Sequence, residues 1–283
     1  MSADAEVAQP ITAGVAHMTF ADYLGLPGVS QSMLNKINES PFALQQWEQR
    51  EQTPAMKLGS ATGCAILEPE LFLQQYWRRT VNGSTKEGKA EKARHEDKVL
   101  LPPAEWAKCV GMKKAIWERG HAISLRVRRI LLAARECDGI ENSLFVADEE
   151  NALWKKGRPD IWLPDQKILA DIKTTKSARK HSFRRSIRTY GYHRQAAWYI
   201  ALCNALGFEV DHYFLVCIES STPHEIFIYH LGERSLKLGQ QECERLYARY
   251  VKCLAENHWP PAQEKAEDID LEEWAFMQEG ADQ

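Results

Sequence analysis

Apolar positions divide the chain into a largely helical first half and a second half in which strands and helices alternate. Ser30 precedes apolar residues at helical spacing, so it is expected to cap a helix. Residues 57–67 are rich in small side chains and predict a tightly packed helix, although Gly63 lies in its middle. Residues 104–136 also show helical spacing. Residues 80–98 are highly charged without an apolar face, which predicts a loop or mobile flap.

Strands are predicted where short apolar runs lie between turn residues, at 143–146, 153–156, 161–163, 167–170, 212–218 and 225–229. A helix over 194–206 precedes the last two of these strands, and a long amphipathic helix over 233–257 follows them. This order predicts a single α/β domain with a mixed sheet and a helical N-terminal part, over 18–262. A flexible leader at 1–17 and an acidic C-terminal tail at 263–283 are expected to flank it.

Two aspartates and a lysine lie at the centre of the strand region. Asp160 and Asp171 are eleven residues apart on a predicted hairpin, and Lys173 follows on the same face as Asp171, because side chains alternate along a strand. The two carboxylates and the backbone carbonyl of Ile172 suit a hard cation such as Mg²⁺. Lys173 can position a metal-bound water and stabilise a phosphoryl transition state. Such residues are also common at strand ends on protein surfaces, so the spacing alone leaves a structural role open.

Composition narrows the class of protein. With 44% hydrophobic and 27% charged residues, the 283-residue chain is ordinary for a globular protein, and no apolar run approaches the ~18 residues that span a bilayer. The N-terminus lacks the basic and apolar regions of a secretory signal. The seven cysteines form no Cys-x-x-Cys pair, which favours reduced thiols in the cytoplasm and argues against a disulfide framework, a zinc site or an iron–sulfur cluster. No Walker loop is present.

Charge is segregated along the chain, although its net value is only −3. The segment from Lys173 to Arg188 carries no acidic residue, and a second basic cluster comprises Arg126, Arg128, Arg129 and Arg135. Such a distribution predicts a polyanion-binding face, whereas a solvated helix face normally has acidic residues interspersed. Beyond Lys173, the candidate DNA contacts in the first segment are Lys176, Arg179, Lys180, Arg184, Arg185 and Arg188.

Arg158-Pro159-Asp160 followed by Asp171-Ile172-Lys173-Thr174-Thr175 resembles the PD-(D/E)XK nuclease superfamily, and in particular the RecE-type exonucleases (exodeoxyribonuclease VIII) and their phage relatives. Further stretches agree in consistent order from about residue 20 to Trp274, at 28–34, 58–61, 67–70, 192–196 and 214–216. The resemblance implies a restriction-endonuclease-like core, a mixed sheet flanked by helices. It also implies a Mg²⁺-dependent deoxyribonuclease, with Mn²⁺ as a substitute, that digests linear duplex DNA 5′ to 3′ and leaves a 3′ single strand. A RecT-type annealing recombinase as partner, a ring-shaped homo-oligomer and a bacterial or phage-infected cytosol are further implications.

The resemblance also assigns site residues. Gln195 and Tyr199, four apart on one helix face, match residues beside the catalytic carboxylates, although Tyr199 alone would equally be a core aromatic. Glu141 matches an acidic residue that orients water or a second metal in some relatives, or else belongs to a solvated turn. Gly63 stands where these relatives carry a metal-binding histidine, and a water or a neighbour such as Glu68 would have to fill that place. A catalytically weak or silent DNA-end-binding protein and an endonuclease therefore stay open as alternatives.

Overall fold

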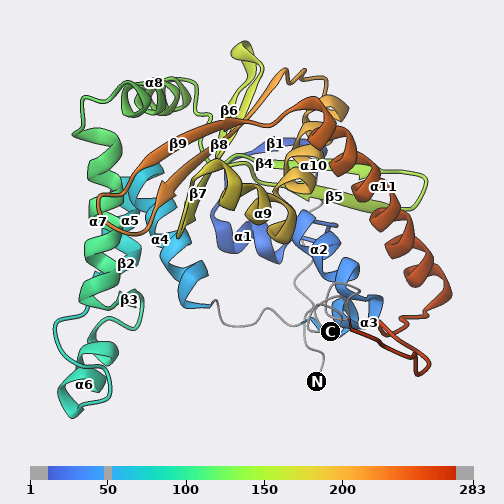
Figure 1. Cartoon of the computed structure of the whole chain (residues 1–283), viewed down its shortest axis with the longest axis horizontal. Coiled ribbons are helices and arrows are strands. Elements are labelled where there is room, and N and C mark those ends of the chain that lie inside the picture. Colours follow the sequence, from blue (N-terminus) through green and yellow to red (C-terminus); the bar gives the residue numbers. More distant parts are fainter. Residues whose placement is uncertain (1–11, 48–52, 272–283) are drawn as a thin grey trace, which may run out of the picture.

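A four-stranded mixed sheet forms the centre of the computed structural model, which describes residues 12–47 and 53–271 (Figure 1). Its strand order is β6 (Ile161–Leu163), β7 (Ile168–Thr175), β8 (His212–Glu219) and β9 (Ile226–His230). Strands β6 and β7 pair antiparallel around a 3-10 turn at Pro164–Gln166, β7 and β8 pair parallel, and β8 and β9 pair antiparallel. The predicted hairpin is confirmed, and β7 extends beyond its predicted end so that Asp171 lies within the strand.

A second, antiparallel sheet has the order β1 (Gly14–Ala16), β4 (Ser143–Asp148) and β5 (Leu153–Gly157). The first of these strands falls inside the segment predicted as a flexible leader. Its three residues pair with β4, with Val15 opposite Leu144, and a strand of this length carries too little pattern to be recognised. Residues 1–11 lie outside the described residues, as do residues 272–283 of the predicted acidic tail.

The charged segment 80–98, predicted as a loop or flap, instead contains helix α6 (Lys86–Arg94). This helix connects β2 (Tyr76–Arg78) to β3 (Val99–Leu101), which pair in parallel. Glu91 points inward and accepts hydrogen bonds from Thr80 and Trp77, so an acidic side chain, not an apolar face, anchors the helix. Sequence periodicity does not detect an anchor of this kind.

Helices cover both faces of the central sheet (Figure 1). Alternate residues of β7 point to opposite sides: Leu169 packs with α10 (Tyr192–Ala205) and α11 (Glu233–Glu256), and Ala170 packs with α7 (Pro103–Trp117) and α8 (Ala122–Glu136). The remaining helices are α1 (Phe20–Gly25), α2 (Gln31–Glu39), α3 (Pro41–Gln45), α4 (Pro54–Leu67), α5 (Pro69–Gln75) and α9 (Lys180–Tyr190). The expected α/β class, with a mixed sheet flanked by helices and a helical N-terminal part, is confirmed. Within the described residues, none of the helices is long and apolar enough to cross a bilayer.

The helix predictions hold where an apolar stripe or a cap defines the element. The hydroxyl of Ser30 accepts the backbone N–H of Met33 and caps α2, as expected. Helix α4 spans the predicted small-residue segment and packs against β7, where Gly59 lies opposite the hydroxyl of Thr174. This contact places α4 at the same end of β7 as Lys173.

Candidate active site

Asp160 and Asp171 are held beside each other by reciprocal contacts with the backbone. Asp160 directly precedes β6, and its Oδ2 accepts the N–H of Ile172 at 2.7 Å. In return, Oδ1 of Asp171 accepts the N–H of Asp160 across a longer distance of 3.5 Å. Nζ of Lys173 lies 3.8 Å from Oδ1 of Asp171. The structure therefore brings together the three residues that the sequence placed on the hairpin.

The electrostatics of this pair are unusual for a structural contact. The pKa of Asp171 is raised to about 7, chiefly by burial and also by the charge of Asp160, against the opposing effect of Lys173. Burial also raises the pKa of Asp160, against the opposing effect of Lys173. Oδ2 of Asp171 is buried without a hydrogen-bond partner. A fully buried carboxylate with an unsatisfied oxygen, next to a second, partly buried carboxylate, is costly, and a divalent cation is the usual compensation.

The donor set fits a magnesium-type ion in part. Two carboxylates and the carbonyl of Ile172 are hard oxygen donors, and Mg²⁺ commonly retains several waters beside one or two carboxylates. Across residues 12–47 and 53–271, however, no three His, Cys, Asp or Glu side chains converge into a complete metal-binding cluster. Asp160 and Asp171 would hold the ion, with solvent completing its shell.

Lys173, Gln195 and Tyr199 form a chain of hydrogen bonds beside the carboxylates. Nζ of Lys173 donates to Oε1 of Gln195 at 2.8 Å, and Nε2 of Gln195 donates to the hydroxyl of Tyr199 at 3.3 Å. Burial lowers the pKa of Lys173, but Asp171 and Asp160 together raise it above its usual value, so the ammonium stays charged. Tyr199 is also packed in the core, so both interpretations of this residue describe part of its environment. The ring of Tyr192 lies 4.9 Å from Nζ of Lys173, a contact that the sequence did not predict.

Glu141 lies next to Asp160 and is not a solvated turn residue. Its N–H donates to the carbonyl of Asp160 at 3.1 Å, and its Oε2 accepts from Nε of Arg158 at 2.7 Å. Burial, followed by the charge of Asp160, raises the pKa of Glu141 to about 8 against the opposing effect of Arg158. Arg158 also donates to the hydroxyl of Ser143 and the carbonyl of Met18. The sequence motif contains this arginine, but motif matching gave it no role; the structure shows that it binds Glu141.

Gly63 lies in α4 with free space beside it. A Cβ atom added at this glycine would meet no heavy atom within 4 Å, so no close packing requires a glycine there. Glu68 is the C-cap of α4. Burial raises the pKa of Glu68, and Arg158 opposes this rise. The charge of Glu68 in turn raises the pKa of Glu141. Glu68 therefore lies within electrostatic reach of the carboxylate cluster. Its role as a substitute ligand stays a prediction.

The predicted basic segment forms an exposed face directly after β7. Phe183 is buried against Tyr229 and anchors α9, while the six candidate DNA contacts are exposed. Among them Arg179 alone has an ion pair within the described part of the chain, with Glu225 at 3.7 Å. We call this surface the α9 basic face; it consists of Lys176, Arg179, Lys180, Arg184, Arg185 and Arg188.

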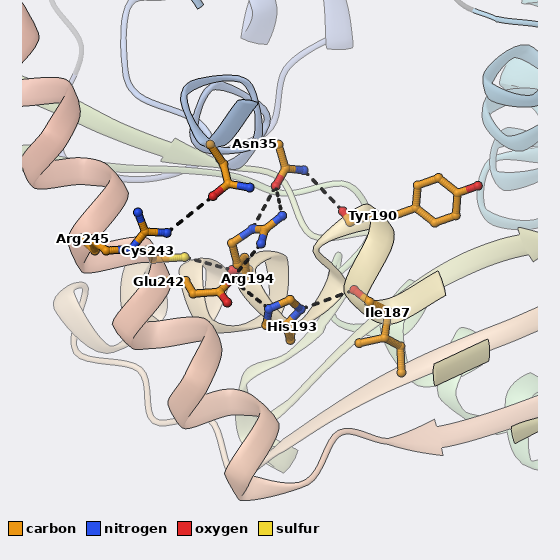
Figure 2. A network of polar contacts seen from close by, with 9 residues as sticks. Asn35, Ile187, Tyr190, His193, Arg194, Glu242, Cys243 and Arg245 are labelled. Atoms are coloured by element: carbon orange, nitrogen blue, oxygen red, sulfur yellow. Dashed lines mark hydrogen bonds and ion pairs between the residues drawn. The ribbon is translucent and has the colours of Figure 1, made fainter. Parts of the chain in front are cut away.

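A buried polar network fixes the start of α10 just before Gln195 (Figure 2). Glu242 of α11 accepts from Arg194 at 2.7 Å and lies 3.0 Å from Nε2 of His193. Arg194 also donates to Oδ1 of Asn35 on α2, and Asn35 donates to the carbonyl of Tyr190 at the end of α9. One charged cluster thus connects the helix carrying Gln195 with the basic helix. The run of polar residues His193-Arg194-Gln195 inside an apolar helix is the signal in the sequence that points to this network. The residues that Arg194 binds, Glu242 and Asn35, lie about 50 and 160 positions away in the chain and could not be identified from it.

Comparisons with known proteins agree with this architecture. None of the curated proteins matches the chain significantly. Among solved structures, a protein from Eubacterium rectale named "Putative exonuclease" superposes with a TM-score of 0.56 at 15% identity, covering 94% of this chain and 99% of that one. A phage-related exonuclease from Haemophilus somnus gives a TM-score of only 0.28 at 12% identity, covering 62% of this chain and 90% of the other. The first similarity shows a shared fold, and the second is too weak to support an argument.

The family model described as "PDDEXK-like domain of unknown function (DUF3799)" matches residues 30–272, which is most of the chain. The match contains both aspartates, Lys173, Gln195 and the α9 basic face. The expected restriction-endonuclease-like core and the resemblance to the PD-(D/E)XK superfamily are therefore confirmed. The chain belongs to the PDDEXK-like family DUF3799.

Proposed function

We propose that this protein is a metal-dependent deoxyribonuclease. The observation that carries the proposal is the adjacent pair of the partly buried Asp160 and the fully buried Asp171, whose Oδ2 has no hydrogen-bond partner, beside a charged Lys173 that Gln195 holds in place. A bound divalent cation would neutralise the phosphoryl oxygens and lower the pKa of its water. The α9 basic face, which begins directly beyond β7, would bind the phosphate backbone without reading base sequence.

The residues of the chain have separate tasks in this proposal. Asp160 and Asp171 hold the cation. Lys173 stays protonated, so it donates a hydrogen bond that orients the attacking water and stabilises negative charge on the phosphoryl group. Gln195 and Tyr199 restrain the lysine side chain, which keeps its ammonium directed toward the carboxylates. Arg158 donates a hydrogen bond to Glu141, whose own N–H donates to the carbonyl of Asp160, so the two residues support the backbone at Asp160.

The finer activity that we propose is 5′-to-3′ digestion of linear duplex DNA with Mg²⁺, or with Mn²⁺ as a substitute. It is supported by the RecE-type sequence resemblance and by the exonuclease name of the Eubacterium rectale protein. Under the same proposal the product is a 3′ single strand for a RecT-type recombinase. The enzyme would act as a homo-oligomeric ring in the cytoplasm.

The test is a time course with 5′-labelled linear duplex, closed-circular duplex and single-stranded DNA in Mg²⁺ and in Mn²⁺. The proposal predicts loss of linear duplex with release of nucleotides from the 5′ end, while circular DNA stays intact. Asp171→Ala should abolish the activity. Asp165→Ala is the matched control, because this exposed aspartate lies in the turn of the same hairpin. Intact linear DNA in both metals would refute the catalytic proposal, and cleavage of circular DNA would indicate an endonuclease.

One observation favours a second candidate, a weak or silent DNA-end-binding protein. The described residues contain no complete three-residue metal cluster, and Gly63 supplies no side chain where RecE-type relatives have a histidine. Gly63→His discriminates between the two. A large gain in metal affinity and cleavage means that the natural protein lacks a ligand, whereas unchanged activity means that another group already completes the site.

DNA binding can be tested apart from cleavage. Removing three cations from the α9 basic face with Arg184→Ala, Arg185→Ala and Arg188→Ala should weaken duplex binding and reduce the slope of log affinity against log salt by about 2 to 3. The matched control removes Arg234, Lys237 and Lys252, three exposed cations of α11. Equal losses in both triple variants would mean that α9 is not the binding face.

A further inference from the structure

A hollow on the side of the central sheet away from Lys173 and Gln195 gathers two arginines of α8 and one histidine each from β8 and β9. It has a volume of about 670 Å³ and lies between α8 and the adjoining ends of β8 and β9. The residues that give it its chemistry are Arg126, Arg129, Gln166, His212, Phe214 and His230, and we call it the Arg/His hollow. Its volume falls in the range of about 300–1,000 Å³ that is typical of small-molecule sites.

The Arg/His hollow is separate from the candidate active site. Phe214 packs on the side of the sheet that faces α7 and α8, together with Ala170 and Ile172. Asp171 and Lys173 point to the other side, where Gln195 of α10 meets the lysine. The hollow also lies at the opposite end of β7, since His212 pairs with Ile168, the first residue of that strand.

Positive charge in the hollow has no local compensation. Arg126 and Arg129 are exposed on one face of α8, and no acidic residue lines the hollow. Neither arginine forms an ion pair with another described residue. The guanidinium of Arg126 lies 5.5 Å from the centre of the Phe214 ring, which holds it over the hollow. The nearby acids Glu209 and Asp211 lie outside the lining and face Lys167, at 2.6 and 3.8 Å.

His212 and His230 form a pair that an anion would reorganise. Nδ1 of His212 lies 3.3 Å from Nε2 of His230, so one ring must donate and the other accept. If both rings are protonated, both nitrogens become donors and can turn toward an oxyanion. Burial, followed by the charges of His212 and Arg126, lowers the pKa of His230, so the free protein resists this state. A bound anion would reverse that effect, because it favours the charged form of each ring.

We propose that the Arg/His hollow binds a phosphate group, carried either by a free mononucleotide or by a DNA strand. Two arginines provide planar donors suited to phosphate oxygens, and the histidine pair adds donors as it takes up protons. The choice of mononucleotide and DNA as the sources of phosphate rests on the proposed nuclease function, which supplies both. The binding chemistry of the hollow does not depend on cleavage at Asp171.

The experiment follows the Cε1–H signals of the histidines by NMR while inorganic phosphate, dAMP or a short duplex is added to the full chain. His212→Gln and His230→Gln identify the two signals among the nine histidines. The proposal predicts that both signals shift, and that Arg126→Gln with Arg129→Gln weakens the response by about tenfold or more. Arg234→Gln with Lys237→Gln on α11 is the charge-matched control and should leave it unchanged.

The arms of the experiment separate the sources and the competing explanations. A response to dAMP and phosphate indicates a free nucleotide, and a response to duplex alone indicates a DNA strand; both support the proposal. Sulfate, whose charge is constant from pH 8 to 6, should bind more tightly at pH 6, because proton uptake by the histidine pair supplies additional donors. No shift with any probe would overturn the proposal, as would an unchanged response in the arginine variant or a stronger response to a hexaglutamate peptide. Asp171→Asn should keep the shifts of both histidine signals, because this position lies outside the Arg/His hollow. Phosphate binding in the hollow is therefore tested separately from cleavage at Asp171.

Discussion

Replacing Asp171 with asparagine should stabilise the metal-free protein while it removes activity. Asp171 is completely buried beside Asp160, and its Oδ2 has no hydrogen-bond partner. Asparagine keeps the shape and an oxygen that can still accept the N–H of Asp160. The amide group of the asparagine removes one buried charge. Its N–H donors can reach Asp160, because the side chains at positions 160 and 171 are close enough to share a hydrogen bond when one carboxyl is protonated.

The size of this effect follows from the pKa of Asp171, which burial raises to about 7 from the usual 3.8. Each unit corresponds to about 1.36 kcal/mol, so the full cost of ionising this carboxyl at pH 8 has a ceiling of about 4 kcal/mol. Lys173 loses a charged neighbour in the variant, and Asp160 shares the same proton, so we expect a net gain of about 1–2 kcal/mol. Because the folded carboxyl binds its proton more tightly than the unfolded one, wild-type stability should fall as the pH rises from about 4 through 7.

Urea unfolding in EDTA at pH 5.5 and pH 8 measures this directly. Wild type should be more stable at pH 5.5, and Asp171→Asn should be the more stable protein at pH 8 and depend less on pH. Adding Mg²⁺ should stabilise wild type at pH 8 but leave the variant nearly unchanged. An Asp171→Asn protein that is less stable than wild type at pH 8 in EDTA would show that the carboxylate is a net structural contact, contrary to the reasoning above.

Three further changes test other parts of the structure. Gly63→Ala should raise the free energy of unfolding by about 1 kcal/mol, because helix propensity improves and the added Cβ meets nothing within 4 Å. Calorimetry in EDTA would detect this gain as a rise of about 2 °C in the melting temperature. A lower melting temperature would contradict the open space at this position. Arg194→Met should lower the free energy of unfolding in urea by about 3–5 kcal/mol, because Glu242 and Asn35 lose their charged partner. Slower cleavage by this variant at unchanged DNA affinity would show that Gln195 has shifted. Lys156→Met should lower the free energy of unfolding by about 2–4 kcal/mol, because this buried ammonium donates to three carbonyls between residues 23 and 26. The control Lys155→Met removes a partly exposed ion pair and should lower it by less than about 1 kcal/mol.

The central part of the site could be predicted from the sequence because its geometry is local. Period-two alternation put Asp171 and Lys173 on one face of β7, and a short turn brought Asp160 back beside Asp171. These relations span about a dozen residues, so the hairpin register alone determines them. Gln195 needed the family resemblance, because nothing in its local spacing shows that α10 returns to Lys173.

The missed contacts share a different property: they join segments that are distant in the chain and depend on buried polar groups. Arg158 reaches the carbonyl of Met18, Lys156 reaches that of Tyr23, and Arg194 reaches Asn35. Hydrophobic periodicity places apolar faces, but it does not indicate which carbonyl a buried cation will bind. Helix α6 was missed for the same reason, since its buried anchor is the carboxylate of Glu91.

Burial and charge also bear on the two roles, structural and metal-binding, that the sequence left open for the aspartates. A structural surface pair would be solvated and would retain ordinary pKa values. Both Asp160 and Asp171 have raised pKa values, and Asp171 is fully buried with an unsatisfied oxygen. Such a pair lowers the stability of the metal-free fold, so packing does not explain it, whereas the proposed cation would compensate the two carboxylates. Gly63 gives the opposite result: the helix would be more stable with almost any other residue, and the space beside it is open, so nothing in the structure explains the glycine. The two carboxylates therefore argue for a metal site, and Gly63 limits the number of protein ligands that this site can offer.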